Sequence, residues 1–365
     1  MAVASVISEC DSTLNIGFLE NTDPDLLASR FFPSKVGGHP AWLDLKNLPE
    51  VEALNCEKCS KPLGFLLQIY APLEDNAKCF HRQMYVFMCL DAKCHEGTLA
   101  PFKVFRSQLS RENEFYPFEA PIEKADWEPE LHAGKYNQLC RACGCRGTKK
   151  CSGCGKVNYC SREHQTMDWK FRHKSECKNA DFTFKYSENQ DAVPSLNLSP
   201  FEIVILGDDE EVSDSDDDGG REVDIDKQVE KMRELEKNGG TLSGHDLEEF
   251  CSEDDVMKDK NFKRFQKVVK RASDQVIRYQ RSEEPLWISD QNVPSDKEIP
   301  NCENCGSKRV FEFQIMPQLL YSLKLDKSVK EQSIDWGTLI IYTCEKSCSH
   351  KVGYNLEFLW KQIIT

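Results

Sequence analysis

The chain has 365 residues, of which 47 are Lys or Arg and 61 are Asp or Glu, giving a formal net charge of −14. This length exceeds one compact domain, so we expect two or three folded units. Because Lys and Arg dominate the binding of phosphate groups, the acidic balance argues against general affinity for nucleic acid.

The beginning of the chain does not resemble a secretory signal peptide. Its first residues, MAVASVISECDSTLNIGF, lack the basic start and the continuous apolar stretch of a signal peptide. The sequence contains no run of about 18 apolar residues. We therefore expect a soluble, intracellular protein with no membrane partner.

Residues 1–130 are predicted to form the first half of a β domain. Two apolar runs, 63–73 and 83–90, are typical of buried strands, and each lies next to a pair of cysteines. The preceding segment 34–43 contains two adjacent glycines, which permit unusual backbone angles. We expect this segment to be a structural loop with Trp42 packed inward.

Residues 135–178 contain a dense run of cysteine and histidine. Two cysteines separated by two residues can both reach one zinc ion from a tight turn, so such pairs recur as half-sites. The segment has too little core to fold without metal. Its candidate ligands are Cys140, Cys143, Cys151, Cys154, Cys160, His164, His173 and Cys177.

The order of these ligands closely resembles the pattern of a MYND zinc finger, with Tyr159 in the expected aromatic position. In MYND fingers the ligands of the two zinc ions interleave. The resemblance therefore implies that one zinc is held by Cys140, Cys143, Cys160 and His164, and the other by Cys151, Cys154, His173 and Cys177.

The surface of this finger is predicted to be basic. Residues 135–178 contain eleven Lys or Arg and three Asp or Glu. MYND fingers generally bind peptides, often proline-containing, so the resemblance favours a protein partner over nucleic acid. Gln165 and Trp169 are candidate peptide contacts, although simple packing is an equally good explanation for Trp169.

Residues 179–284 are predicted to be a linker. Its run 207–220 carries eight acidic and no basic residues, and such a segment repels itself and cannot form a core, so we expect it to be disordered. Segments 224–239 and 258–281 have helical spacing. The second has an apolar stripe that predicts a helix docked on the β domain, or one that binds a partner; it comprises Phe262, Phe265, Val269, Ala272, Val276 and Tyr279.

Residues 285–365 repeat the plan of the first unit in the same order. Each unit has a cysteine pair, a strand, a spacer, a strand and a second cysteine pair. The candidate ligands are Cys56, Cys59, Cys89 and Cys94 in the first unit and Cys302, Cys305, Cys344 and Cys348 in the second. Pairs of this spacing in a long chain favour zinc over disulfides.

The expected fold class is α+β, mainly β. Neither outer unit is large enough to bury both faces of its strands, so we expect the two to pack together as one pseudo-symmetric, zinc-stapled β domain. The MYND finger would be a separable insertion, followed by the helical and disordered acidic linker. Two Zn²⁺ ions in the finger and two in the outer units account for sixteen ligands; the remaining cysteines are Cys10, Cys79, Cys145 and Cys251.

Taken together, these segments resemble the programmed cell death protein 2 family, in which the divided β domain is called the TYPP domain. The resemblance implies a dedicated chaperone that binds a small-subunit ribosomal protein, the universal fifth protein of the 40S subunit, and supports 40S ribosome biogenesis in the cytoplasm and nucleus. If the fourteen cysteine ligands are ionised and four Zn²⁺ ions are bound, the net charge is near −20. Such a charge is compatible with a basic client.

Two other classes of function remain as alternatives. The finger could make the protein a transcriptional or chromatin adaptor that binds proline-containing peptides. Lysine methyltransferases also contain MYND fingers, but the sequence has neither the Asn-His-x-Cys motif nor the glycine-rich cofactor segment of a SET domain. Because each predicted zinc site has four protein ligands, as structural sites do, we do not expect an enzyme.

Overall fold

The computed structural model describes residues 14–73, 75–96, 101–119, 131–188, 193, 198–207, 259–325, 334–348 and 352–363. Apart from Gly207, the acidic run predicted at 207–220 lies outside the described residues. So does the helix predicted at 224–239. Within the described residues, no helix is both long and apolar enough to cross a membrane.

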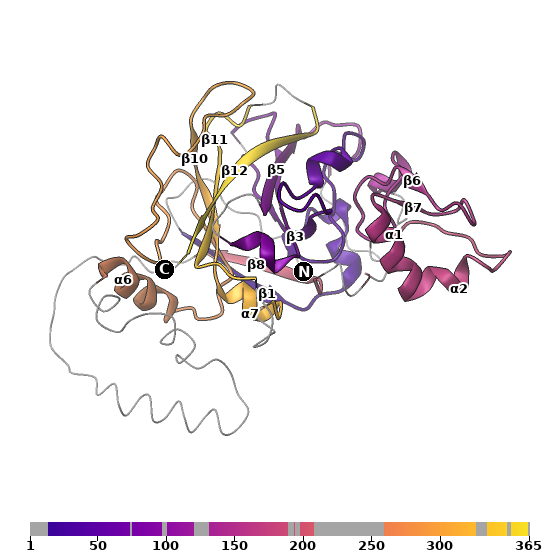
Figure 1. Cartoon of the computed structure of the whole chain (residues 1–365). Helices are drawn as coiled ribbons and strands as arrows, with labels where there is room; N and C mark the ends of the chain where they lie inside the picture. Colours follow the sequence, from indigo (N-terminus) through magenta and orange to yellow (C-terminus); the bar gives the residue numbers. More distant parts are fainter. Residues whose placement is uncertain are drawn as a thin grey trace.

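Ten strands form one closed barrel in which every neighbouring pair is antiparallel (Figure 1). The order around the barrel is β1-β8-β2-β3-β4-β5-β12-β11-β10-β9. In chain order the strands are β1 (Asn15–Glu20), β2 (Lys35–Val36), β3 (Gly64–Tyr70), β4 (His81–Met88), β5 (Phe102–Leu109), β8 (Phe201–Gly207), β9 (Ile277–Tyr279), β10 (Arg309–Ile315), β11 (Thr338–Cys344) and β12 (Tyr354–Gln362).

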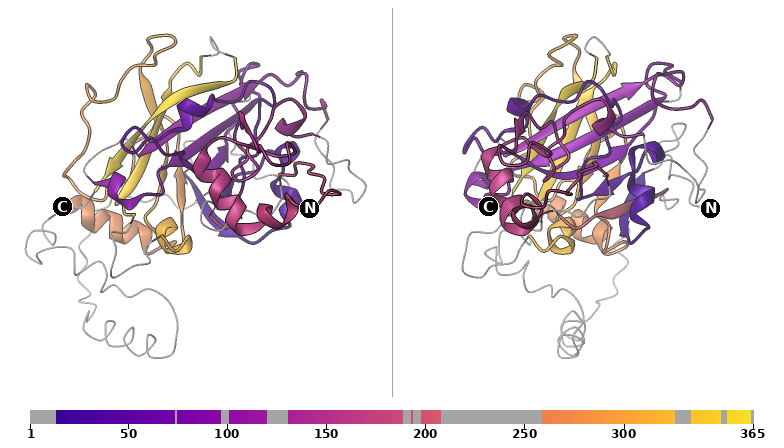
Figure 2. Two further views of the ribbon diagram at one scale, coloured as in Figure 1. Left: turned by 45° about the vertical axis from the view of Figure 1, so that its right-hand side comes forward. Right: turned by 90° about the vertical axis from the view of Figure 1, so that its right-hand side faces the viewer.

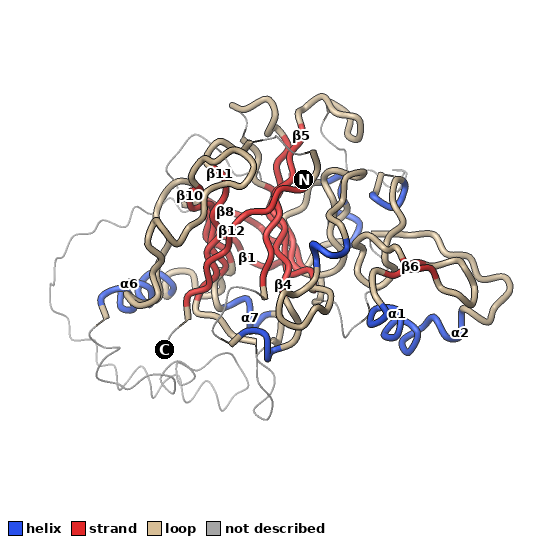
Figure 3. Tube along the Cα trace, turned by 45° about the horizontal axis from the view of Figure 1, so that its top comes forward, coloured by secondary structure: helices blue, strands red, loops and turns tan. Residues whose placement is uncertain are grey.

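The remaining elements are short and lie around the barrel (Figure 3). The finger contains the two-stranded sheet β6 (Lys149–Lys150) and β7 (Asn158–Tyr159), followed by α1 (Arg162–Asp168), the π-helical turn η6 (Trp169–His173) and α2 (Lys174–Glu176). The longer helix α6 (Lys260–Val269) and the short α7 (Gln318–Ser322) belong to the C-terminal part. The 3-10 turns are η1 (Pro24–Leu27), η2 (Ser29–Phe31), η3 (Val51–Leu54), η4 (Ala92–His95) and η5 (Ala133–Lys135).

The prediction of a mainly β domain built from both ends of the chain is confirmed by this barrel. Strands β3-β4-β5 and β12-β11-β10 meet at the antiparallel pair β5–β12. Each outer hairpin also has a register shift, at Leu66 in β3 and at Glu312 in β10, and each shift lies seven residues after a Cys-x-x-Cys turn. Pseudo-symmetry of the complete halves stays a prediction.

The predicted linker contributes two barrel strands, which corrects the expectation that 179–284 is only linker and helices. Strand β8 lies between β1 and β2, with Ile203 and Ile205 buried. Strand β9 joins β1 to β10. The predicted helix at 258–281 therefore ends early, because Val276 and Tyr279 belong to the barrel core, and helix α6 stops at Val269.

The apolar run in β4 is buried on both faces of the sheet. Met84 and Val86 belong to the barrel core, whereas Tyr85 and Phe87 point to the outer face, where they stack on Trp42 with ring centroids 5.2 and 6.0 Å away. Trp42 is fully buried, as expected from the sequence. Because an outer layer covers this part of the sheet, the strand lacks the polar alternation of a half-exposed strand.

Two buried ion pairs connect the N-terminal strands to the C-terminal strands. Arg82 donates two hydrogen bonds to Glu312, at 2.7 and 2.9 Å, and both side chains are fully buried. Arg106 pairs with Glu357 at 2.7 Å. Burial alone would raise the pKa of Glu312, but the Arg82 guanidinium outweighs it and lowers that pKa to about 2.

Replacing Glu312 by Gln should lower the free energy of unfolding by about 3–5 kcal/mol, because the Arg82 charge would remain buried without a counter-charge. Urea unfolding at a fixed zinc concentration measures the change. Glu345→Gln is the matched control, since Glu345 pairs with Lys308 on the surface and should lose less than about 1 kcal/mol. Equal losses in the two variants would contradict a special role for the buried pair.

Candidate zinc centres

The N-terminal zinc site lies at the open end of the β3–β4 hairpin. Cys56 and Cys59 form a turn before β3, and Cys89 and Cys94 lie just after β4. The open end is where a two-stranded hairpin has no covalent connection. A metal held by both turns therefore closes the hairpin there.

The C-terminal zinc site has the same position on the β10–β11 hairpin. Cys302 and Cys305 precede β10, whereas Cys344 and Cys348 lie at and beyond the end of β11. Because every strand pair from β3 around to β10 is antiparallel, the two hairpins run in opposite senses. The two outer sites consequently lie at opposite ends of the barrel.

Each outer zinc loop is held by a strand of the other half of the barrel. On the C-terminal loop, Arg106 of β5 donates to the Cys348 carbonyl at 3.0 Å and Gln108 donates to the Ser347 carbonyl at 3.0 Å. On the N-terminal loop, Lys361 of β12 donates to the His95 carbonyl at 3.1 Å. The metal loops are therefore part of the connection between the two halves.

The sulfur spacings fit tetrahedral zinc and not disulfides. Zn–S bonds of about 2.3 Å in a tetrahedron place sulfur atoms about 3.8 Å apart, whereas a disulfide requires about 2.05 Å. None of the described cysteines forms a disulfide. The Sγ–Sγ distances are 3.7 Å for Cys59–Cys89, 3.8 Å for Cys143–Cys160, 3.9 Å for Cys151–Cys177, 3.6 Å for Cys302–Cys348 and 3.5 Å for Cys305–Cys344.

In the finger, the structure brings together the same two interleaved sets that the MYND resemblance implied. The ligand atoms of Cys140, Cys143, Cys160 and His164 lie within 4.8 Å of one another, as do those of Cys151, Cys154, His173 and Cys177. His164 turns Nδ1 toward Cys160 at 3.1 Å, whereas His173 turns Nε2 toward Cys154 at 3.5 Å. The two histidines thus present different ring nitrogens to their sites.

The thiols are packed in a way that favours a bound cation. Burial raises the pKa of the Cys89 and Cys348 thiols, and the neighbouring Cys140 raises the pKa of the Cys160 thiol. Each outer set holds four thiolates and each finger set holds three, and in so small a volume they would repel one another without a counter-charge. The chemistry of the donors and their spacing therefore suit Zn²⁺, which binds thiolates and releases their protons. The protein is accordingly a zinc protein.

A network of charged residues orients the second zinc site of the finger. Arg141 donates to both oxygens of Glu176, at 2.5 and 2.9 Å, and Glu176 lies 3.6 Å from Nδ1 of His173. The Arg141 guanidinium also lies 3.3 Å from Nδ1 of His173, so the Glu176 carboxylate balances its positive charge beside this ring nitrogen while Nε2 faces the metal ligands. Arg141 and Glu176 were not predicted from the sequence, in which the only signal was a glutamate one helical turn after His173.

The finger is packed against the loop predicted at 34–43 and the residues that follow it (Figure 2). Trp42 donates from its indole nitrogen to the Gly144 carbonyl at 2.9 Å, and Asn137 donates to the Leu45 carbonyl at 2.8 Å. Gly144 has φ +71°, and a Cβ there would lie 2.8 Å from Cβ of His39. Finger cysteines and Trp42 share one buried cluster. The finger is therefore packed into the core of the protein, whereas the sequence predicted a separable insertion.

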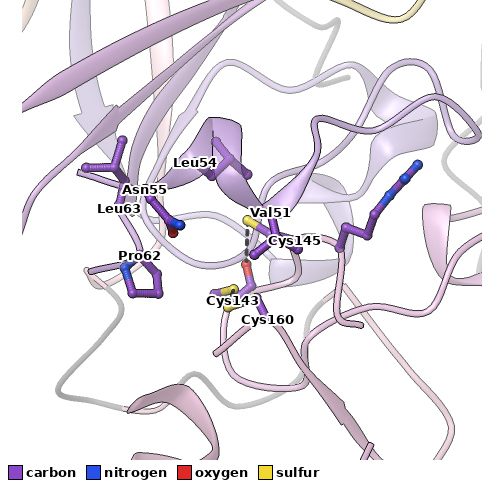
Figure 4. A pocket seen from close by; sticks show the side chains of 9 residues that line it. Val51, Leu54, Asn55, Pro62, Leu63, Cys143, Cys145 and Cys160 are labelled. Atoms are coloured by element: carbon purple, nitrogen blue, oxygen red, sulfur yellow. Dashed lines mark hydrogen bonds between the residues drawn. The ribbon is translucent and has the colours of Figure 1, made fainter. Parts of the chain in front are cut away.

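A small pocket lies where the finger meets the first zinc unit (Figure 4). Its lining is largely apolar, and Leu54, Pro62 and Leu63 face the cysteines of the finger. The unassigned Cys145 is buried here, with its thiol 3.7 Å from the Cys143 carbonyl. Cys79 is buried as well, 3.8 Å from the Ser347 carbonyl, whereas Cys10 and Cys251 lie outside the described residues.

The two candidate peptide contacts lie close together on the finger. Gln165 in α1 and Trp169 in η6 are both half-buried and are one helical turn apart. The Trp169 ring also packs edge-on against the His173 ring, with centroids 5.8 Å apart. Trp169 is therefore in position both to support a zinc ligand and to present part of its ring to solvent.

Comparison with known proteins gives matches along most of the chain. Residues 13–123 match the N-terminal domain of programmed cell death protein 2, residues 259–363 match its C-terminal putative domain, and residues 140–177 match the MYND finger. No solved structure matches the chain.

Full-length relatives include two mammalian proteins and one from fission yeast. Programmed cell death protein 2 of Rattus norvegicus is 41% identical over 97% of both chains, and that of Bos taurus is 42% identical over 98% of both. Probable 20S rRNA accumulation protein 4 of Schizosaccharomyces pombe is 22% identical over 89% of this chain and 91% of its own.

The purified protein should contain four zinc ions per chain, one for each ligand set, by elemental mass spectrometry. Cys302→Ser should lower the content to three, because it removes one ligand of the C-terminal set. Cys145→Ser is the control and should retain four, since Cys145 belongs to none of the sets. A wild-type content of two would show that the outer sites do not bind zinc.

Glu176→Gln should weaken zinc binding at the second finger site by about 10- to 100-fold, because the carboxylate facing His173 would be lost. Competition with a chromophoric chelator measures the affinity of the most weakly bound zinc. Glu163→Gln supplies the control, as Glu163 is exposed in the first turn of α1. Identical zinc affinities in both variants would argue against the orienting role.

Proposed function

Because the chain belongs to the programmed cell death protein 2 family, we propose that it is a dedicated chaperone of a small-subunit ribosomal protein and supports biogenesis of the 40S subunit. The observation that carries the proposal is the full-length relative in fission yeast, whose name concerns the accumulation of 20S rRNA. The universal fifth protein of the subunit is the proposed client.

The charge of the chain supports a basic client. Ribosomal proteins bind RNA through basic surfaces, and an acidic carrier can attract and shield such a surface before assembly. The net charge is −14 before thiolates and zinc are counted. Long-range attraction of this kind increases the rate of association and weakens as salt concentration rises.

The arrangement of the metals supports a structural role for zinc in this function. Each ligand set offers four protein donors, so a bound zinc ion would have no open position for a catalytic water. We propose that the protein is not an enzyme and that zinc maintains the surface that binds the client. We also propose that the two halves of the barrel are pseudo-symmetric copies of one unit, supported by the matched register shifts at Leu66 and Glu312.

We propose that the protein acts in both the cytoplasm and the nucleus. A ribosomal protein is synthesised in the cytoplasm and joins the assembling subunit in the nucleus, so its chaperone would accompany it between the two. Within the described residues no membrane-spanning helix is present.

A peptide-binding adaptor is the second candidate function. The half-buried Gln165 and Trp169 favour it, because they lie on one side of the finger and leave polar and aromatic surface accessible to a proline-containing peptide. This binding could also accompany the chaperone function, with the finger recruiting a further protein.

Capture of the tagged protein together with translating ribosomes should enrich the messenger RNA of one small-subunit ribosomal protein, if the client is bound as it is synthesised. Sequencing of the captured messenger RNA measures the enrichment. Tagged Cys302→Ser, which loses one zinc ligand of the barrel, should reduce it. Absence of any small-subunit client would overturn the chaperone proposal.

A variant with Gln165→Ala and Trp169→Phe distinguishes the adaptor from the chaperone. Deleting the whole finger would expose the buried cluster around Trp42, so it is a poor test. The double variant preserves an aromatic ring against His173 and changes the exposed face. Client capture should persist in this variant, whereas loss of all partners would favour the adaptor.

A further inference from the structure

The exposed face of α6 carries an unusual concentration of positive charge for an acidic protein. Six cations occur between residues 260 and 271, and all are exposed; they are Lys260, Lys263, Arg264, Lys267, Lys270 and Arg271. Helix α6 itself contains no acidic residue. We call these six side chains the α6 cationic stripe.

The spacing places the stripe on one side of the helix. At 100° per residue, its members fall within an arc of about 120° and extend about 16 Å along the axis. Lys270 and Arg271 lie just beyond α6, where the Lys270 amide donates to the Gln266 carbonyl and the Arg271 amide donates to the Val268 carbonyl, so the last turn continues the helical path. The stripe is therefore straight and continuous.

The opposite face of α6 is packed against segments that follow β9 and β10. Phe262, Phe265 and Val268 are buried in a cluster with Leu286, Ile288 and Met316. At the start of the helix, Asp259 accepts hydrogen bonds from the amides of Asn261 and Phe262 and from the Ser289 hydroxyl. These contacts hold the stripe outward and leave the helix little freedom to rotate.

No member of the stripe forms an ion pair with another described residue. Ion pairs elsewhere in the C-terminal part involve Arg281, Lys308 and Arg309 instead. Helix α6 also lies on the side of the barrel away from the finger (Figures 1 and 3). It is thus a second basic surface, separate from the basic finger.

We propose that the α6 cationic stripe binds the phosphate backbone of RNA without reading its sequence. A regular row of cations on a rigid helix can contact several phosphates of one continuous backbone, and such contacts carry no base specificity. No large exposed apolar or aromatic side chain lies within 260–271 to stack on a base. The ligand is therefore a polyanion recognised by its charge.

The same observations argue against a membrane surface. A helix that binds a bilayer inserts an apolar face between the lipids, whereas the apolar face of α6 is already buried against Leu286, Ile288 and Met316. The carboxylates of an acidic peptide occur only where its sequence places Asp or Glu, whereas a nucleic-acid backbone carries charge at regular intervals. A backbone with one charge on every nucleotide is the better match for the stripe.

The net charge of the protein does not prevent this binding. At physiological ionic strength the electrostatic screening length is about 8 Å, so a phosphate at the stripe responds mainly to nearby charges. This binding goes beyond the proposed chaperone function, which concerns a protein client. It would allow one surface to contact RNA while the client is bound elsewhere.

Fluorescence anisotropy of a labelled single-stranded RNA of about 16 nucleotides tests the proposal. For the intact zinc-loaded protein, affinity should fall as KCl rises from about 50 to 200 mM, with a log–log slope of up to about −4 for six phosphate contacts. The variant Lys263→Ala with Lys267→Ala should bind about tenfold more weakly at low salt, and its slope should be shallower by about 1.4.

Two control variants separate the stripe from other basic surfaces. Lys263→Arg with Lys267→Arg keeps both charges and should bind RNA as the wild type does. Lys149→Ala with Lys150→Ala removes two exposed lysines of the finger and should leave RNA binding unchanged. Zinc content and the unfolding midpoint should be the same in all variants, because every substituted side chain is exposed.

The proposal is overturned if the wild type does not bind RNA at about 50 mM KCl. It is also overturned if Lys149→Ala with Lys150→Ala lowers the affinity for RNA as much as Lys263→Ala with Lys267→Ala does. Stronger binding to vesicles of phosphatidylserine and phosphatidylcholine, or to a peptide of the sequence 208–218, would assign the stripe to a different partner. Capture of the ribosomal client is measured separately, so failure of either proposal leaves the other intact.

Discussion

The antiparallel seam between β5 and β12 is the constraint on which the rest of the structure depends. Because this pair is antiparallel, the two halves of the barrel have opposite orientations, and their zinc sites lie at opposite ends. Each metal loop is then held by a strand of the other half, through Arg106 and Gln108 at one end and Lys361 at the other. Metal binding and closure of the barrel are therefore coupled, and part of the binding energy of zinc stabilises the fold.

This coupling extends to the finger through the loop that contains Trp42. The indole contacts Tyr85 of the barrel on one side and donates to the Gly144 carbonyl of the finger on the other. The zinc site of Cys140 and Cys143 consequently belongs to the same buried cluster as the outer face of β4. Loss of zinc from the finger should therefore also lower the stability of the barrel. A partner that binds the finger contacts a module that is packed firmly on the barrel.

Much of the metal chemistry could be predicted from the sequence, because zinc imposes short and regular ligand spacings. The interleaved grouping of the finger ligands came from the MYND resemblance, whereas spacing alone left the grouping open. The orientation of His173 by Arg141 and Glu176 could not be predicted, because only the fold brings Arg141 of the first cysteine turn to the helical segment that carries His173 and Glu176. The spacing left Cys145 unassigned, and only the fold places it beside the pocket.

The sequence by itself determined the mainly β class, the repeated order of cysteine pairs and strands, and the acidic charge, since these depend on composition and local periodicity. The tertiary structure alone decided that 201–207 and 277–279 are barrel strands. A strand as short as Ile277–Tyr279 has little local signal, and its conformation comes from pairing with β1 and β10. Likewise, helical spacing predicted a long helix through Tyr279, but burial of that residue in the barrel ends α6 at Val269.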